Sequence, residues 1–344
     1  MSGQPVGTIT LEVTYRCHRR CAFCYVPALA TPDATSAQEL PARELARLAA
    51  AVVRATGCKH VQLSGGEPLL RADLLPLIDG LAKAGARTSI ITDGAHLDAS
   101  LASSLAERQV AAVQPTLLSG SAELHDSLRG PGAFREATRA IATAAAAGLK
   151  VSVCMVVTRL NYQEAERVAE LCFALGARGL ALSRFCPAGR AAAAAGALMP
   201  DAAQVRAAAQ AAASACRSLG LPLAAAVTIP RCVWSDPDRP PIRVGVCSLV
   251  GPKSTVTIGP DGAVRSCSLS TKTVGSLASE PWETLCRRLW DGELGALRAS
   301  TPEPCRDCPQ LARCLGGCRL SALAMFADAS RPDPLAPVAC AGDV

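Results

Sequence analysis

The chain has 344 residues, half of them hydrophobic, which is enough for one large buried core and favours a large domain with a smaller one. Its net charge of +6 is mild, and no dense stripe of Lys and Arg with interleaved aromatic residues supports nucleic-acid binding. Seventeen cysteines in a long chain without a signal peptide argue against a secreted disulfide scaffold, and no apolar run is long enough to span a membrane. We therefore expect a cytoplasmic protein whose thiolates bind metal.

Short apolar strands alternate with amphipathic helices over the first two thirds of the chain. The expected strands are Thr8–Val13, His60–Leu63, Arg87–Thr92, Ala112–Thr116, Lys150–Val157 and Gly179–Ser183. The expected helices are Pro41–Thr56, Asp73–Ala84, Ala99–Arg108, Ala133–Ala147 and Tyr162–Leu175. Six such repeats predict an α/β fold with a parallel sheet, doubly wound or curled into a partial barrel. Ligands are expected at the carboxyl ends of its strands.

The amino-acid composition changes after a further expected helix at Ala202–Leu219. Proline becomes frequent, and a hairpin is expected from Ser254–Ile258 to Ala263–Cys267, with the turn Gly259-Pro260-Asp261-Gly262 between them. We place a domain boundary here, giving domains 1–220 and 221–344.

A first cysteine cluster, Cys17-His-Arg-Arg-Cys21-Ala-Phe-Cys24, follows the first strand directly. Three thiolates at these spacings suit three irons of a 4Fe-4S cluster, because thiolate is a soft ligand, and the fourth iron stays open. A zinc knuckle is the alternative. Zinc, however, usually takes four closed ligands in structural sites, and His18 is adjacent to Cys17 rather than at ligand spacing.

This loop resembles that of the radical SAM superfamily, in which S-adenosylmethionine binds the open iron. Gly65-Gly66-Glu67, after the second strand, resembles the family motif that hydrogen-bonds the methionine amino group, and the glycines permit close backbone approach. Thr92-Asp93-Gly94 stands where relatives commonly carry Thr-Asn-Gly near the ribose. The resemblance implies that the cofactor is bound by Phe23, Tyr25, Gly65, Gly66, Glu67, Pro68, Thr92, Asp93 and Thr116. The stretch His125-Asp126-x2-Arg129-Gly130 also matches the family, and we expect it to cap a helix and close a loop.

The C-terminal cysteines match the seven-cysteine pattern of the SPASM domain, which resembles a holder for two auxiliary 4Fe-4S clusters. The resemblance assigns one cluster to Cys305, Cys308, Cys314 and Cys340, and three ligands of the other to Cys247, Cys267 and Cys318. The fourth iron of the latter stays open, takes a non-cysteine ligand, or recruits a residue such as Cys232. Paired structural zinc sites are the alternative. The implied architecture is a partial (β/α)6 TIM-like barrel followed by a small cysteine-rich SPASM domain with a β-hairpin and short helices.

The segment Ser183–Arg190, after the sixth strand, faces the expected cavity. Arg184 and Arg190 are candidates for binding a carboxylate, and Cys186 for donating a hydrogen atom or touching substrate. We carry Cys186 and Arg184 as candidate catalytic residues.

The resemblance implies reductive cleavage of S-adenosylmethionine to a 5′-deoxyadenosyl radical by an oxidoreductase that modifies a peptide or protein side chain, as maturases of ribosomally made peptides do. One alternative is an enzyme of haem-type biosynthesis that modifies a tetrapyrrole side chain. The second alternative is a non-catalytic zinc-binding scaffold. An external one-electron reductant of flavodoxin or ferredoxin type is expected. Because sixteen residues precede Cys17, we also expect a separate leader-peptide recognition protein or a leader-free substrate.

Overall fold

The structure is a computed structural model that describes residues 6–30, 39–234, 240–250 and 253–337. Its first strands are β1 (Val6–Thr14), β2 (His60–Gly65), β3 (Arg87–Thr92), β4 (Ala112–Pro115), β5 (Val153–Val157), β6 (Leu180–Arg184) and β7 (Leu223–Ala225). The helices among them are α1 (Ala42–Thr56), α2 (Leu74–Lys83), α3 (Ala99–Glu107), α4 (Ala122–Arg129), α5 (Ala133–Ala146), α6 (Ala165–Ala174), α7 (Ala195–Leu198) and α8 (Ala202–Leu219). The six expected strands and the expected helices are therefore confirmed, with ends that differ by up to three residues.

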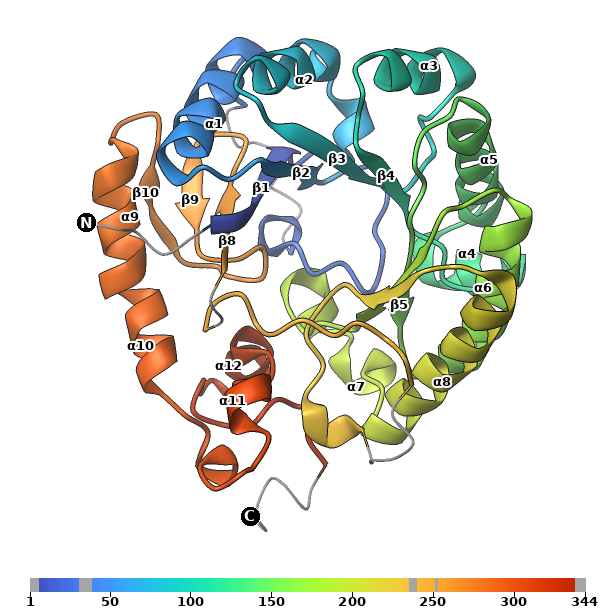
Figure 1. Cartoon of the computed structure of the whole chain (residues 1–344), viewed down its shortest axis with the longest axis vertical. Coiled ribbons are helices and arrows are strands. Elements are labelled where there is room, and N and C mark those ends of the chain that lie inside the picture. Colours follow the sequence, from blue (N-terminus) through green and yellow to red (C-terminus); the bar gives the residue numbers. More distant parts are fainter. Residues whose placement is uncertain (1–5, 31–38, 235–239, 251–252, 338–344) are drawn as a thin grey trace.

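The strands form a curved wall with the helices outside it (Figure 1). The strand order is β10-β9-β8-β1-β2-β3-β4 in one sheet and β5-β6-β7 in the other. Parallel bridges from Val113 to Val151 and from Thr116 to Cys154 join the two sheets between β4 and β5. The expected partial barrel is confirmed; β1 pairs with β2 on one side and with β8 on the other, and β7 is the far edge of the second sheet.

The core lies between this wall and its outer helices. In β1, Ile9, Leu11 and Val13 are fully buried. Thr10 and Glu12, which lie between them, are buried as well, as expected for a strand covered on both faces. The inward side of α1 contributes Leu45 and Val52 to the same core. This packing fixes where β1 ends, and therefore where the first cysteine loop begins.

The C-terminal third contains β8 (Ser254–Ile258), β9 (Ala263–Arg265), β10 (Thr273–Ser276), α9 (Trp282–Asp291), α10 (Glu293–Ala299), α11 (Leu311–Cys314) and α12 (Arg319–Phe326). The expected hairpin is confirmed, and Gly262 takes the left-handed conformation in its turn, with φ of 80°. The hairpin is not a separate sheet, however, because β8 pairs in parallel with β1 and places Val256 opposite Ile9. This pairing gives hydrogen-bond partners to the backbone N–H and C=O groups along one edge of β1. A buried strand cannot leave these groups unpaired. The boundary near residue 220 stays a prediction.

Two buried ion pairs tie the C-terminal third to the barrel. Arg265 on β9 contacts the carboxylate of Glu12 on β1, and the Tyr15 hydroxyl donates to the same carboxylate at 2.9 Å. Arg184 at the end of β6 donates from Nη1 to Asp333 Oδ1 at 2.6 Å, with both residues almost wholly buried. In the described part of the chain, no helix has both the length and the apolar character needed to cross a bilayer.

Candidate functional site

The first cysteine cluster forms a tight loop directly after β1. The backbone N–H of Cys24 donates to the carbonyl of Cys21 at 3.2 Å, and all three thiols are half-buried. Burial, with a smaller contribution from the nearby Cys21, raises the pKa of Cys17 to about 11, and the same two causes raise the pKa of Cys24. Three thiols thus influence one another in one loop. A bound metal would reverse their preference for the protonated form, because metals bind the thiolate.

The glycine motif after β2 holds this loop in place. Gly66 N–H donates to the Thr14 carbonyl at 2.7 Å, and Glu67 N–H donates to the Arg16 carbonyl at 2.9 Å. A Cβ atom on Gly65 or Gly66 would overlap those same two carbonyl oxygens. From the sequence, these glycines are expected to let the backbone approach a ligand closely. In the structure, Gly65 and Gly66 also lie against the backbone that leads into the cysteine loop. This contact alone already requires glycine at both positions.

The side chain of Glu67 joins the ends of two strands. Its carboxylate accepts hydrogen bonds from Thr92 Oγ1 at 2.6 Å, from Asp93 N–H at 2.8 Å and from Leu69 N–H at 3.0 Å. Burial and the neighbouring Asp93 raise the pKa of Glu67 to about 8. The structure therefore brings together the predicted residues at the ends of β2 and β3, and Pro68 begins the short turn that follows Glu67.

Buried polar atoms without a hydrogen-bond partner lie beside the cysteine loop. Asp93 Oδ2 is 3.2 Å from Arg19 Nε and 3.2 Å from His18 Nε2, and 4.0 Å from Arg129 Nη2. Within the described residues, Asp93 Oδ2, Arg19 Nε and Arg129 Nε have no hydrogen-bond partner, nor does His125 Nε2. Buried polar groups are normally hydrogen-bonded, so this cluster fits a polar ligand with both acidic and basic groups. Arg19 is not among the residues predicted from the sequence. Its only signal was the basic run inside the cysteine loop.

The end of β4 and the helix after it form the next side of the site. The Thr116 carbonyl accepts from Arg129 Nη1 at 3.0 Å, and Leu118 N–H donates to His125 Nδ1 at 3.2 Å. Burial, reinforced by Arg129, lowers the pKa of His125 to about 3, so the imidazole is neutral. Asp126 accepts from the N–H groups of Gly132 and Phe134 at the start of α5, which confirms the expected cap.

The segment after β6 covers the cysteine loop from the other side. Ala191 N–H donates to the Cys24 carbonyl at 3.0 Å, and Arg190 Nε donates to the Leu29 carbonyl at 3.0 Å. Phe23 packs against a cluster that includes Phe185, while burial raises the pKa of Tyr25. These contacts give the half-buried cysteine loop a partly apolar surrounding.

The two candidate catalytic residues are both buried. Arg184 binds a carboxylate of the chain itself, that of Asp333, a residue not predicted from the sequence. The thiol of Cys186 donates to the Arg184 carbonyl at 3.6 Å. Cys186 also lies close enough to Cys318 and Cys267 that a charge on Cys318 raises the pKa of Cys186, and a charge on Cys186 raises the pKa of Cys267. A direct contact of Arg184 or Cys186 with substrate stays a prediction.

Cys247, Cys267 and Cys318 gather from three separate segments. They lie before β8, after β9 and at the start of α12. Burial raises the pKa of Cys247 and of Cys267 to about 12 each, and each feels the charge of Cys318. Backbone N–H groups lower these pKa values in part, and hydrogen bonds of this kind stabilise the sulfurs of iron–sulfur clusters. The trio therefore fits three ligands of such a cluster.

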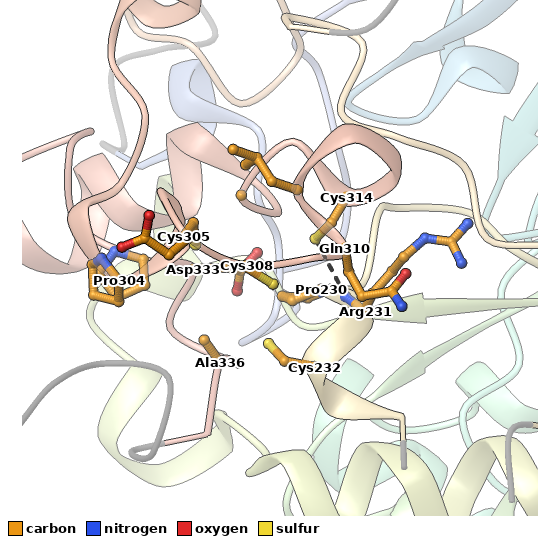
Figure 2. A pocket seen from close by; sticks show the side chains of 14 residues that line it. Pro230, Arg231, Cys232, Pro304, Cys305, Cys308, Gln310, Cys314, Asp333 and Ala336 are labelled. Carbon is orange, nitrogen blue, oxygen red and sulfur yellow. Dashed lines mark hydrogen bonds between the residues drawn. The ribbon is translucent and has the colours of Figure 1, made fainter. Parts of the chain in front are cut away.

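A second group of cysteines lines a pocket of about 300 Å³ near α11. Figure 2 shows Cys305, Cys308 and Cys314 around it, together with Cys232. Cys340, the fourth cysteine assigned here by the sequence, lies outside the described residues. In the part of the chain that is described, no three His, Cys, Asp or Glu side chains are grouped as one metal ion would require. In a 4Fe-4S cluster, by contrast, each thiolate binds its own iron.

Comparison with curated proteins finds relatives along nearly the whole chain. The PqqA peptide cyclase of Ruegeria pomeroyi is 32% identical, over 94% of this chain and 85% of its own length. The PqqA peptide cyclase of Methylocella silvestris is 30% identical, over 96% of this chain and 87% of its own length.

Solved structures share the fold at low sequence identity. Streptococcus suis SuiB bound to its precursor peptide SuiA superposes with a TM-score of 0.76 at 16% identity, over 98% of this chain and 76% of that one. The anSMEcpe structure with bound AdoMet superposes with a TM-score of 0.69 at 16% identity, over 94% and 92% of the two chains. The model of the radical SAM superfamily matches residues 11–172, which include the cysteine loop and the glycine motif. With these motifs, this fold and relatives at 30% identity or more, the chain belongs to the radical SAM superfamily and is an enzyme.

Proposed function

We propose that this enzyme modifies a side chain of a peptide or protein by radical chemistry. The observation that carries the proposal is the extent of the relatives. Two peptide cyclases align with at least 94% of the chain. These relatives favour a peptide over a tetrapyrrole, and they give no support to a zinc scaffold.

In this proposal Cys17, Cys21 and Cys24 hold a 4Fe-4S cluster. When bound, the cluster would pass one electron from the external reductant to S-adenosylmethionine, giving methionine and a 5′-deoxyadenosyl radical that would take a hydrogen atom from the substrate. The chain positions the reactants and excludes water. Glu67 holds the ends of β2 and β3 together through its hydrogen bonds with Thr92 and Asp93.

The cofactor-binding set is proposed as the sequence indicated it: Phe23, Tyr25, Gly65, Gly66, Glu67, Pro68, Thr92, Asp93 and Thr116. The buried pair Asp93 and Arg19 would face the polar parts of S-adenosylmethionine, because Asp93 Oδ2 and Arg19 Nε lie 3.2 Å apart as an ion pair but make no hydrogen bond among the described residues. Gly65 and Gly66 act chiefly by holding the cysteine loop in place. The aromatic residues Phe23 and Tyr25 would form the apolar side of the site.

Two auxiliary 4Fe-4S clusters are proposed in the C-terminal domain, residues 221–344. Their ligands in the sequence assignment are Cys247, Cys267 and Cys318 for one, and Cys305, Cys308, Cys314 and Cys340 for the other. Such clusters would accept the electron that an oxidised product leaves behind. A flavodoxin- or ferredoxin-type reductant, a separate leader-recognition protein and a cytoplasmic location complete the proposal.

The test is anaerobic reconstitution, followed by incubation with S-adenosylmethionine, a chemical reductant and a PqqA-type peptide. The expected products are 5′-deoxyadenosine and a peptide lighter by about 2 Da, because closing a ring between two side chains removes two hydrogen atoms. A tetrapyrrole carboxylate serves as the competing substrate. Turnover of the tetrapyrrole without any change in the peptide would favour the alternative.

A further inference from the structure

Arg319, at the start of α12, is a buried cation without a partner carboxylate among the described residues. It is 1% exposed, and its Nη2 donates to the carbonyl oxygen of Ser300 at 2.5 Å and to Ser300 Oγ at 2.9 Å. Its Nε and Nη1 have no hydrogen-bond partner in the described part of the chain. The buried Arg184 and Arg265, by contrast, each contact a carboxylate. Since burying an unpaired charge is costly, the guanidinium of Arg319 fits an anionic partner of another kind.

Arg319 lies between the two groups of C-terminal cysteines. It follows Cys318 directly, and its backbone N–H forms a hydrogen bond to Cys247 that partly opposes the rise in the pKa of that thiol on burial. Its Nη1 lies against Gly316, where an added Cβ atom would come within 3.1 Å of it. Burial lowers the pKa of Arg319, and the charges of Cys247 and Cys305, one from each cysteine group, oppose that shift.

The carboxylates of this region do not neutralise Arg319. Asp333 is committed to Arg184, whose Nη1 donates to it at 2.6 Å. Asp328 is exposed, accepts hydrogen bonds from Ser330 at 2.7 Å, and acts on the pKa of Arg319 less strongly than either of the two cysteines does. Cluster ligands bind as thiolates, so the cysteine groups supply negative charge once a cluster is bound.

We propose that the guanidinium of Arg319 is the internal counter-cation of both auxiliary clusters. A 4Fe-4S cluster bound by thiolates is negatively charged, and reduction adds one electron to it. A buried positive charge stabilises the reduced form more than the oxidised form, because water screens it little, and so raises the reduction potential. Arginine suits this role since it stays protonated. The inference rests on the proposed function for the clusters themselves and for their cysteine ligands.

The consequence for the proposed reaction concerns electron transfer to these clusters. A higher potential makes an auxiliary cluster a better acceptor of one electron from the substrate radical, which is oxidised and releases one proton to solvent. Arg319 keeps its own proton throughout, so it acts as a positioning residue for charge and has no contact with substrate in this proposal.

The test reads the auxiliary clusters alone. With Cys17, Cys21 and Cys24 all replaced by alanine, the reconstituted protein should keep about eight irons per chain, because one cubane cluster of three is lost. Arg319→Met is made in this background, and the reduction potentials are measured by anaerobic titration followed by electron paramagnetic resonance. We expect each auxiliary cluster to become at least about tenfold harder to reduce, a lowering of about 59 mV for one electron.

Two control variants separate charge from structure. Arg319→Lys keeps the positive charge, and its potentials should stay within about threefold of the parent in the reduction equilibrium. Arg313→Met removes a cation that is also adjacent to a cluster ligand, Cys314, but is exposed, so that solvent screens it and the change should be below about threefold. Equal shifts in Arg319→Met and Arg313→Met, or equal shifts in the Met and Lys variants of Arg319, would overturn the proposal.

The iron count decides the case in which Arg319→Met does not retain its clusters. About eight irons in Arg319→Lys, with loss in Arg319→Met, would support the need for a positive charge. Equal loss in both variants would show that the shape of arginine is required instead of its charge, and would overturn the proposal.

Further outcomes separate this inference from the proposed function. About eight irons and unchanged potentials in Arg319→Met would overturn the counter-cation and leave the proposed function intact. A parent background without iron would remove the auxiliary clusters, and the counter-cation with them. The radical SAM site is tested separately, by formation of 5′-deoxyadenosine in the wild-type protein.

Discussion

Removing the carboxylate of Asp333 should destabilise the chain severely. Asp333 and Arg184 are 2% and 1% exposed, and they join the end of β6 to the segment that follows α12. In Asp333→Ala the guanidinium of Arg184 stays buried without its partner, which costs about 3–5 kcal/mol. The N–H groups of Cys318 and Leu335 also lose their acceptor, at about 1–3 kcal/mol each where no water replaces it. We expect a total loss of at least about 4 kcal/mol, a large share of the stability of a typical domain.

The assay is urea denaturation of the metal-free protein, followed by circular dichroism. Glu44→Ala is the matched control, because Glu44 pairs with Arg47 on the exposed side of α1 and should leave the midpoint unchanged. The double variant Arg184→Met/Asp333→Leu should be more stable than Asp333→Ala, since apolar residues often replace a buried pair without loss. A cost below about 1 kcal/mol for Asp333→Ala, as for a surface pair, would refute the reasoning.

Three further predictions concern the radical SAM site and its support. Gly66→Ala should displace the cysteine loop through the Arg16 carbonyl and abolish formation of 5′-deoxyadenosine, whereas Gly196→Ala, which has open space around it, should retain activity. Cys21→Ala should lose about four of twelve irons per chain together with that activity; a variant with full iron and full activity would refute the ligand assignment. The pKa of His125 is lowered to about 3, so the unfolded chain binds an extra proton below the ordinary value of 6.5, and stability should fall by about 2 kcal/mol between pH 6.5 and pH 5. Urea midpoints measured across this range should lose that slope in His125→Gln, and an unchanged slope would contradict the burial of a neutral imidazole.

The strands and helices of the barrel could be predicted because local signals agree with the tertiary structure. The α8 helix begins and ends where the sequence indicated, since Asp201 and Gln204 form a capping box and Gly220 closes the helix in the left-handed conformation. The residues of the glycine motif come together with Thr92 because the carboxyl ends of parallel strands share one edge.

Long-range pairings could not be predicted in the same way. The partner of Arg184 is 149 residues away, in a stretch without a periodic pattern, so the sequence suggested an external carboxylate instead. The pairing of β8 with β1 joins strands about 250 residues apart. The sequence pattern that predicts the β8–β9 hairpin is the same whether or not the hairpin joins the barrel. Likewise, nothing around Cys232 indicates which of the two cysteine groups it faces.

The most direct test of the central claim is a single assay of the reconstituted enzyme with S-adenosylmethionine, reductant and peptide, read by mass spectrometry. We expect 5′-deoxyadenosine and methionine in equal amounts, more of both when the peptide is present, and a modified peptide. We also expect that none of these forms in Cys21→Ala. A fully loaded wild-type protein, with about twelve irons per chain, that releases no 5′-deoxyadenosine under reducing conditions would contradict the central claim.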